Sequence, residues 1–233
     1  MLRTLLFVLL AGTHLCAHAT PSEEQRWAFD VFLDKQKIGY HNFVVRQDGA
    51  SKQVEIDAEF DVKILFINAY SYKHNNSERW QGDCLLSLRS ETNDNGERLA
   101  VAGSTLDDQF IVTANNGEDN IDACPMSFAY WNPAFLRATE LINAQTGKLT
   151  PVKIAATGSE LVTVAGEPVT ANTYTVMLEE QIIRLWYAAD DYRWLALETP
   201  ARGDRVLRYQ ATRVPAGNAN PPHVLEQNHA MAY

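Results

Sequence analysis

The sequence predicts a mainly β protein: a strongly curved antiparallel sheet, forming an open or nearly closed barrel, with one amphipathic helix across the concave side. Three observations support this fold class. Apolar and polar residues alternate with period two in many segments. Turn-forming residues separate these segments at the spacing of about 8–12 residues that is typical of sandwiches and barrels. Only one segment has helical periodicity. Roughly ten to twelve strands offer more apolar surface than one short helix covers, so we expect the sheet to curl around an interior that is packed or hollow.

The first element is predicted to be a secretory signal peptide, residues 1–19. Arg3 gives a positive start, Leu5–Leu10 an apolar stretch, and Ala17-His18-Ala19 a cleavage site of the A-x-A type. The apolar stretch is too short to span a bilayer, which disfavours an anchored helix. A lipoprotein reading at Cys16 is disfavoured because the preceding residue is leucine. The sequence therefore predicts an exported, periplasmic protein.

The mature chain is expected to form one curved-sheet domain at 20–214, followed by a disordered tail at 215–233 that lacks apolar periodicity. No later stretch has the ~18–20 apolar residues that a transmembrane helix needs. The net charge of −9 becomes one unit more negative when Arg3 is removed. Such an acidic chain argues against nucleic acid and anionic lipid headgroups as partners, and leaves neutral or apolar ligands open.

The strand pattern is clearest in 54–63, where five apolar residues alternate with four acids and a lysine. Because alternate residues of one strand spread along about 20 Å, these acids are interpreted as a solvated outer face and no metal site is predicted. Further strands are expected in 27–33, 38–47, 70–83, 161–178, 181–200 and 205–214. The turns between strands are predicted at Asp34–Lys37, Asp48-Gly49, Asp94–Gly96 and Asn116-Gly117.

The single helix is predicted in "NPAFLRATELINAQTG", residues 132–147. Asn132 is a suitable N-cap, and Pro133 at the first helical position loses no hydrogen bond there. The apolar stripe is formed by Phe135, Leu136, Leu141 and Ile142, and Gly147 ends the segment.

Two of the three cysteines, Cys84 and Cys124, remain after the signal peptide is removed. In an oxidising compartment such a pair is interpreted as a disulfide, which would stabilise the fold by roughly 4 kcal/mol through a loop of about 40 residues. The alternative is a reactive thiol. It would need a nearby base, and the folded part of the mature chain offers only His41 and His74.

The candidate site residues come from two strand regions and the loop before the helix. In "YSYKHNNSERWQGD", residues 70–83, His74 and Glu78 are candidates for a catalytic acid–base pair, and the alternative is a hydrogen-bonded histidine in a barrel mouth. Arg184 could meet a ligand's carboxylate or headgroup, or stack on its cross-strand aromatic neighbour. The predicted ligand-binding residues are Tyr70, Tyr72, His74, Trp80, Trp131, Phe135, Arg184, Trp186 and Trp194.

Several short motifs carry a resemblance to a known family. They are a tryptophan strand ending in Ile38-Gly39, the run at 70–80, "AYWNP" preceded by Cys124, "LINAQTG", and Trp186-Tyr187 with Trp194-Leu195. With these motifs the chain resembles a family of exported Gram-negative bacterial proteins that carries a domain of unknown function. The resemblance spans nearly all of the mature chain and implies no activity, cofactor or catalytic residue. The order of elements is also similar to that of periplasmic lipoprotein carriers, a fold analogy that does not transfer function.

The expected function is that of a periplasmic binding or carrier protein for a lipid-like or other apolar ligand held in the curved sheet. Aromatic-rich strands and the absence of a catalytic sequence motif favour it. No cofactor is predicted. The alternatives are an envelope-pathway enzyme that uses His74 and Glu78, or a structural or assembly protein that binds an envelope protein through a sheet edge.

Overall fold

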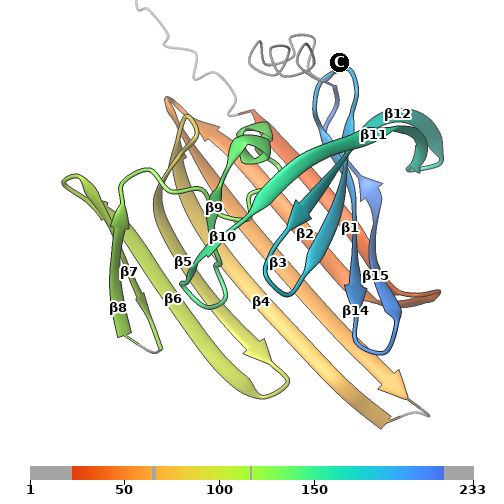
Figure 1. Ribbon diagram of the computed structural model, residues 1–233, viewed down its shortest axis with the longest axis horizontal. Helices are drawn as coiled ribbons and strands as arrows, with labels where there is room; N and C mark the ends of the chain where they lie inside the picture. The colour runs from red at the N-terminus through yellow and green to blue at the C-terminus, as the bar shows by residue number, and fades with distance from the viewer. Residues whose placement is uncertain (1–22, 65–66, 116, 218–233) are drawn as a thin grey trace, which may run out of the picture.

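The computed structural model describes residues 23–64, 67–115 and 117–217. Within these residues thirteen strands form one antiparallel sheet, in the order β11-β12-β13-β14-β15-β1-β2-β3-β4-β5-β6-β7-β8 (Figure 1). The strands are β1 (Glu24–Leu33), β2 (Gln36–Asp48), β3 (Ser51–Ile64), β4 (Ile67–Gln81), β5 (Cys84–Asp94), β6 (Glu97–Leu106), β7 (Gln109–Ala114), β8 (Gly117–Asp122), β11 (Lys153–Val164), β12 (Glu167–Met177), β13 (Ile182–Ala188), β14 (Trp194–Ala201) and β15 (Arg205–Arg213). The prediction of a mainly β, antiparallel protein is confirmed.

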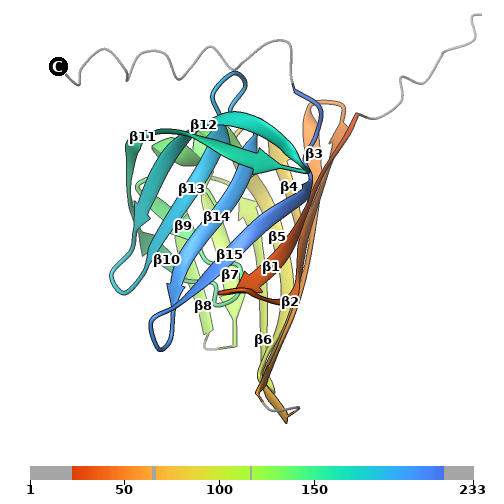
Figure 2. The same ribbon diagram turned by 90° about the vertical axis from the view of Figure 1, so that its right-hand side faces the viewer.

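The sheet curls, so that β11–β15 stand opposite β4–β8 across an interior (Figures 1 and 2). The segment 123–152 leaves the sheet after β8 and lies between these two walls, where β9 (Glu140–Ile142) and β10 (Leu149–Pro151) form a small hairpin. In the described part of the chain no backbone ladder joins β8 to β11, so both strands are sheet edges. The first and last strands of the described fold, β1 and β15, pair with each other in the middle of the sheet.

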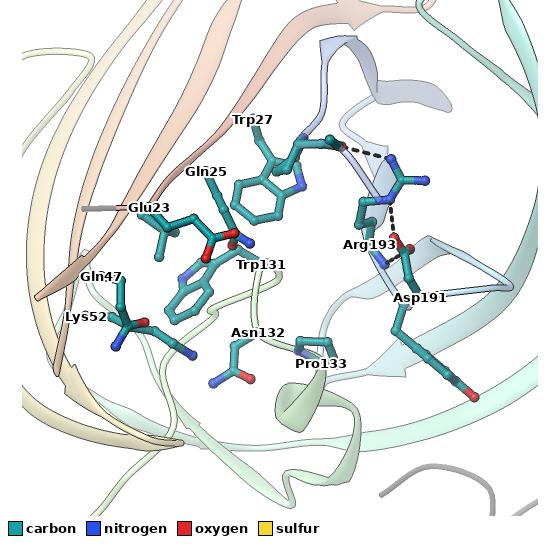
Figure 3. Close-up of a pocket in the computed structure, with 14 residues that line it drawn as sticks. Glu23, Gln25, Trp27, Gln47, Lys52, Trp131, Asn132, Pro133, Asp191 and Arg193 are labelled. Atoms are coloured by element: carbon teal, nitrogen blue, oxygen red, sulfur yellow. Dashed lines mark hydrogen bonds and ion pairs between the residues drawn. The ribbon is translucent and has the colours of Figure 1, made fainter. Parts of the chain in front are cut away.

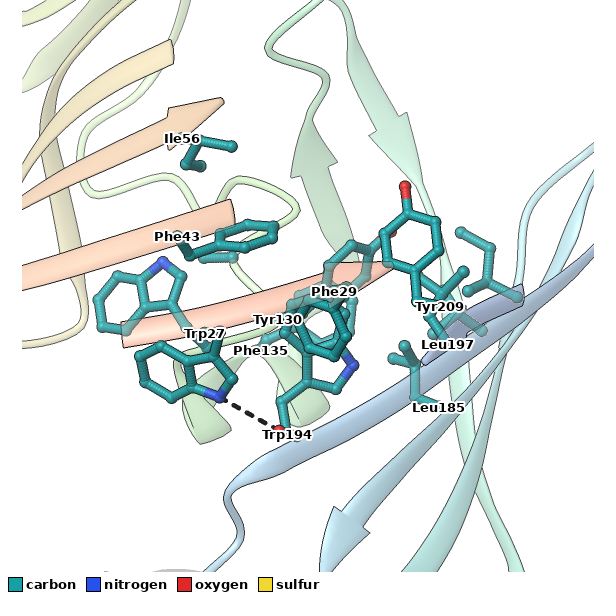
Figure 4. Packing of buried hydrophobic residues seen from close by; sticks show 14 of the residues in the cluster. Trp27, Phe29, Phe43, Ile56, Tyr130, Phe135, Leu185, Trp194, Leu197 and Tyr209 are labelled. Carbon is teal, nitrogen blue, oxygen red and sulfur yellow. Dashed lines mark hydrogen bonds between the residues drawn. The ribbon is translucent and has the colours of Figure 1, made fainter. Parts of the chain in front are cut away.

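The residues that alternate between apolar and polar in the sequence also alternate between buried and more exposed in the structure. In β3, Val54, Ile56, Ala58 and Val62 are buried and the intervening charged residues face outward. The apolar faces of β1, β2, β14 and β15 meet in an aromatic cluster around Trp194 (Figure 4). The Trp194 ring lies 4.3 Å from Phe29 and 5.1 Å from Tyr130, measured between ring centroids. One part of the interior is therefore filled by packed aromatic side chains.

The predicted helix at 132–147 is wrong. Asn132 does act as an N-cap, accepting from the Ala134 amide at 3.0 Å, but the turn that follows is a short 3-10 helix at Pro133–Arg137. The Ile142 amide then donates to Met126 O at 2.8 Å, which ties this segment to the preceding loop. The Asn143 side chain also accepts from the Gln145 amide, a local bond that competes with a helix. Tertiary pairing therefore overrides the helical stripe.

Gly39 marks a close approach between β2 and β3. A Cβ atom added there would lie 1.8 Å from Glu59 O, which is backbone and has little room to move. Only glycine allows this strand pair to keep its register.

Cys84 and Cys124 are disulfide-bonded, with their Cα atoms 4.5 Å apart. The Leu85 amide donates to Pro125 O beside this bond. The start of β5 is therefore joined to the beginning of the interior segment.

The predicted signal peptide at 1–19 lies outside the described residues, as does most of the predicted disordered tail at 215–233. Among the residues that the structure places, no helix has the length and apolar character to cross a membrane.

Candidate functional site

The concave side of the sheet holds a solvent-accessible cavity of about 260 Å³, here called the interior cavity. Strands β2, β3 and β4 form one wall and β13, β14 and β15 the other, while the segment 123–152 contributes the loops between them. Apolar side chains line most of it: Phe43, Ile56, Phe128, Tyr130, Ala144, Leu178, Ile183, Leu197 and Leu207. Figure 4 shows Phe43 and Ile56 on one side and Leu197 and Tyr209 on the other.

Strand β4 adds a polar row to this apolar lining. His74, Asn76 and Glu78 alternate toward the interior and are only 7%, 4% and 4% exposed. Burying polar groups is costly unless they are hydrogen-bonded. His74 Nδ1 shares a hydrogen bond of 2.8 Å with Thr92 Oγ1 on β5. The row is therefore held by its own strand and its neighbour.

Glu78 is the one carboxyl group among the described lining residues. Asn76 Nδ2 donates to its Oε1 at 2.9 Å and Trp80 Nε1 donates to its Oε2 at 2.8 Å. Burial raises the pKa of Glu78, and these hydrogen bonds, with a contribution from Ser127, oppose that rise. The carboxyl group is thus buried with both of its oxygens engaged.

His41 on β2 faces the same cavity. Its Nδ1 lies 3.1 Å from the Tyr209 hydroxyl, and its ring stacks on Phe43 with centroids 4.4 Å apart. Its Nε2 is shielded from solvent and has no hydrogen-bond partner among the described residues. Burial lowers the pKa of His41 to about 3, with a smaller effect from His74, and burial lowers the pKa of His74 to about 4. Both imidazoles are therefore neutral at neutral pH.

His74 and Glu78 do not form the predicted acid–base pair directly. They are four residues apart on one strand, which separates their Cα atoms by roughly 13 Å. Each is bonded to other groups, and Asn76 lies between them. Within the described ranges no group of three or more His, Cys, Asp or Glu side chains is placed to hold a metal ion.

The family profile described as Domain of unknown function (DUF6134) matches residues 29–212. The chain belongs to the DUF6134 family. The matched range runs from β1 to β15 and so includes every strand that lines the interior cavity. The predicted membership of a family with a domain of unknown function is confirmed at this level.

The DUF6134 fold is similar to a solved structure titled as a beta-barrel-like protein of a domain of unknown function, DUF1849, from Brucella abortus. The TM-score is 0.58 at 10% sequence identity, over 84% of this chain and 98% of that chain. At this identity the likeness concerns the fold alone. No curated protein matches the sequence.

The predicted site residues of this DUF6134 chain do not all meet in one site. Tyr72 and His74 line the interior cavity, and the Tyr72 hydroxyl donates to Gln145 Oε1 at 3.2 Å. Trp80, Phe135 and Trp194 are fully buried packing residues, and Tyr70 is partly buried and hydrogen-bonds to Asp94. Arg184 and Trp186 lie outside the cavity.

On that outer side of β13, Arg184 stacks over Trp186, with its guanidinium carbon 4.7 Å from the ring centroid. Both side chains also bond to Glu160 of β11. Arg184 thus stacks on an aromatic ring, but this ring belongs to its own strand β13 and not to a neighbouring strand, as the alternative expected.

Trp131 lines a second pocket of about 300 Å³, at the end of the sheet where β1 begins (Figure 3). Lys52 Nζ lies 5.2 Å from the Trp131 ring centroid, and Arg193 pairs with Asp191 at 2.6 Å. Burial lowers the pKa of Lys52. This pocket shares no lining residue with the interior cavity.

Sequence reasoning did not place His41, Asn76 or Tyr209 in the site. Asn76 could have been found, because period two places it on the same face as His74 and Glu78. Tyr209 could not, because its contact with His41 joins residues 168 positions apart.

Proposed function

We propose that the protein is an exported binding or carrier protein that holds a small, largely apolar molecule in the interior cavity. On this proposal the curved sheet is an open barrel that serves as the container. Small-molecule sites are usually concave and mainly apolar, with a few polar groups that orient the ligand. The interior cavity has this character, with Phe43, Ile56, Ile183 and Leu197 on its walls and the β4 row at its polar side.

The lining and position of the cavity carry this proposal. Protein interiors are close-packed, with few voids larger than a water molecule. A hollow of about 260 Å³ between β2–β4 and β13–β15, lined in large part by apolar side chains, departs from that packing. We infer that a ligand fills this space. Its room corresponds to roughly nine non-hydrogen atoms, at the ~30 Å³ that one water occupies in the liquid.

Native mass spectrometry of the full chain, purified gently from its host, tests the proposal. We expect an adduct of a small molecule that organic extraction removes. Leu197→Trp fills the cavity from β14, where Leu197 is 4% exposed, and should abolish the adduct. Leu161→Trp is the matched control, because Leu161 is 69% exposed on β11.

The proposal fails if the wild-type protein carries no adduct and no uncharged or charged small apolar molecule raises its melting temperature. It also fails if the adduct persists in a folded Leu197→Trp protein, since the ligand would then lie elsewhere.

A further inference from the structure

The interior cavity has a lining with little charge. Among the described residues that face it there is no lysine and no arginine, and Glu78 is the single carboxyl group. A carboxylate or phosphate buried here would lack a cation to compensate its lost hydration. The cavity therefore disfavours fatty acids and anionic headgroups.

A cationic ligand is also disfavoured. The two Glu78 oxygens already accept hydrogen bonds from Asn76 and Trp80. An ammonium group would have to compete with these hydrogen bonds and would lose its own hydration in the cavity. His41 and His74 present neutral rings to the same space.

One open hydrogen-bonding position is an acceptor. Asn76 is 4% exposed, and because its amide nitrogen donates to Glu78, the atom left without a partner is the acceptor Oδ1. Leaving a buried acceptor without a hydrogen bond costs free energy. A ligand that matches it must bring a donor.

The second open position is His41 Nε2. The Tyr209 hydroxyl engages the other ring nitrogen, so Nε2 is a donor or an acceptor according to the tautomer. A neutral group that donates and accepts suits the polar side of this cavity, and a hydroxyl group is the smallest one that does.

We propose that the ligand is an uncharged, hydroxyl-bearing apolar molecule whose O–H group donates to Asn76 Oδ1 while its apolar part lies against Phe43, Ile56 and Leu197. This inference rests on the proposed binding function and specifies its ligand class.

Four probes of matched size separate the ligand classes: 1-octanol, its isomer 1-methoxyheptane, octanoate and octylammonium. The alcohol and the ether have the same nine non-hydrogen atoms, close to the roughly nine for which the cavity has room. Binding to the ligand-extracted full chain is measured by calorimetry at pH 7.5. We expect 1-octanol to bind about tenfold more tightly than each of the other three, the effect of leaving a buried acceptor unpaired or burying an uncompensated charge.

Asn76→Leu removes the acceptor at similar side-chain volume. We expect it to lower the alcohol-to-ether affinity ratio from about tenfold to about one. Asn75→Leu is the control, because Asn75 is the neighbouring residue on the exposed face of β4 and should leave the ratio unchanged. The ratio is measured within each protein. If Asn76→Leu does not fold, the four probes on the wild-type protein decide alone.

Each result of these binding measurements either supports or overturns the proposed ligand class. Equal binding of alcohol and ether by the wild-type protein overturns the hydroxyl assignment, and tighter binding of octanoate or octylammonium overturns the assignment of an uncharged ligand. In both cases the binding function stands. If no probe binds and native mass spectrometry shows no adduct, the proposed function itself fails.

Discussion

The pKa values of two histidines, the buried His74 and the partly buried His41, fall because the fold shields both rings from water. Their pKa values drop from 6.5 to about 3 and about 4, so protons bind more readily to the unfolded chain than to the folded one between these values and 6.5. The histidine contribution to stability is therefore fully present above about pH 6.5 and is lost as the pH falls toward 4. The raised pKa of Glu78 acts in the opposite direction, because the folded state retains its proton to a higher pH.

We expect the free energy of unfolding of the wild-type protein to decrease from pH 7 to pH 4.5, and to decrease less in His74→Gln. For His74 the loss is on the order of 3 kcal/mol once the pH has reached the folded pKa. Urea unfolding at pH 7.0, 5.5 and 4.5 measures it. Parallel pH profiles for the two proteins would show that His74 takes up its proton without resistance from the fold.

At the scale of elements, the strands were predictable and the interior segment was not. Alternation and turn residues are local signals: Asn95 and Gly96, for example, both have the positive φ that the tight turn between β5 and β6 requires. The conformation of residues 132–147 depends instead on the hydrogen bond to Met126 and on the turn at Asn143, which override helical periodicity. For the same reason the β4 part of the site was visible in the sequence, whereas the opposite wall from β13–β15 was not.

The disulfide stabilises this interior segment. Cys84→Ala combined with Cys124→Ala is expected to lower the free energy of unfolding by about 4 kcal/mol, because a loop of 40 residues is then free in the unfolded chain. Urea unfolding with and without dithiothreitol measures the effect. The double variant also serves as the control, because dithiothreitol should leave its free energy of unfolding unchanged. Equal stability of the oxidised wild-type protein and the double variant would contradict the prediction.

At the scale of the molecule, one sheet holds both ends of the chain together. β15 lies between β14 and β1, and the Arg205 side chain bonds to Asp34 at the turn after β1. The interior cavity depends on this arrangement, because β15 supplies Leu207 and Tyr209 while β2 supplies His41. The residues that line the interior cavity therefore come from segments throughout the described chain, from β2 to β15.

A chain that ends at Gly203 lacks β15, and we expect it to lose cooperative thermal unfolding. It would expose the buried face of β1, including Phe29 and Val31. Circular dichroism melting and size-exclusion chromatography test this expectation. A chain that ends at Gly217 keeps all fifteen strands of the described fold and should melt as the full chain does. A cooperative, monomeric product that ends at Gly203 would show that β15 is dispensable for the fold.

The pairing of β1 with β15 also sets an order of events during biosynthesis. The ribosome makes β1 among the earliest strands, yet its second neighbour is the last strand to emerge. Until then β1 has an unpaired hydrogen-bonding edge, which is a site for wrong pairing or aggregation. A ligand of the proposed kind would meet a complete interior cavity only after β15, which supplies Leu207 and Tyr209, has paired with β1.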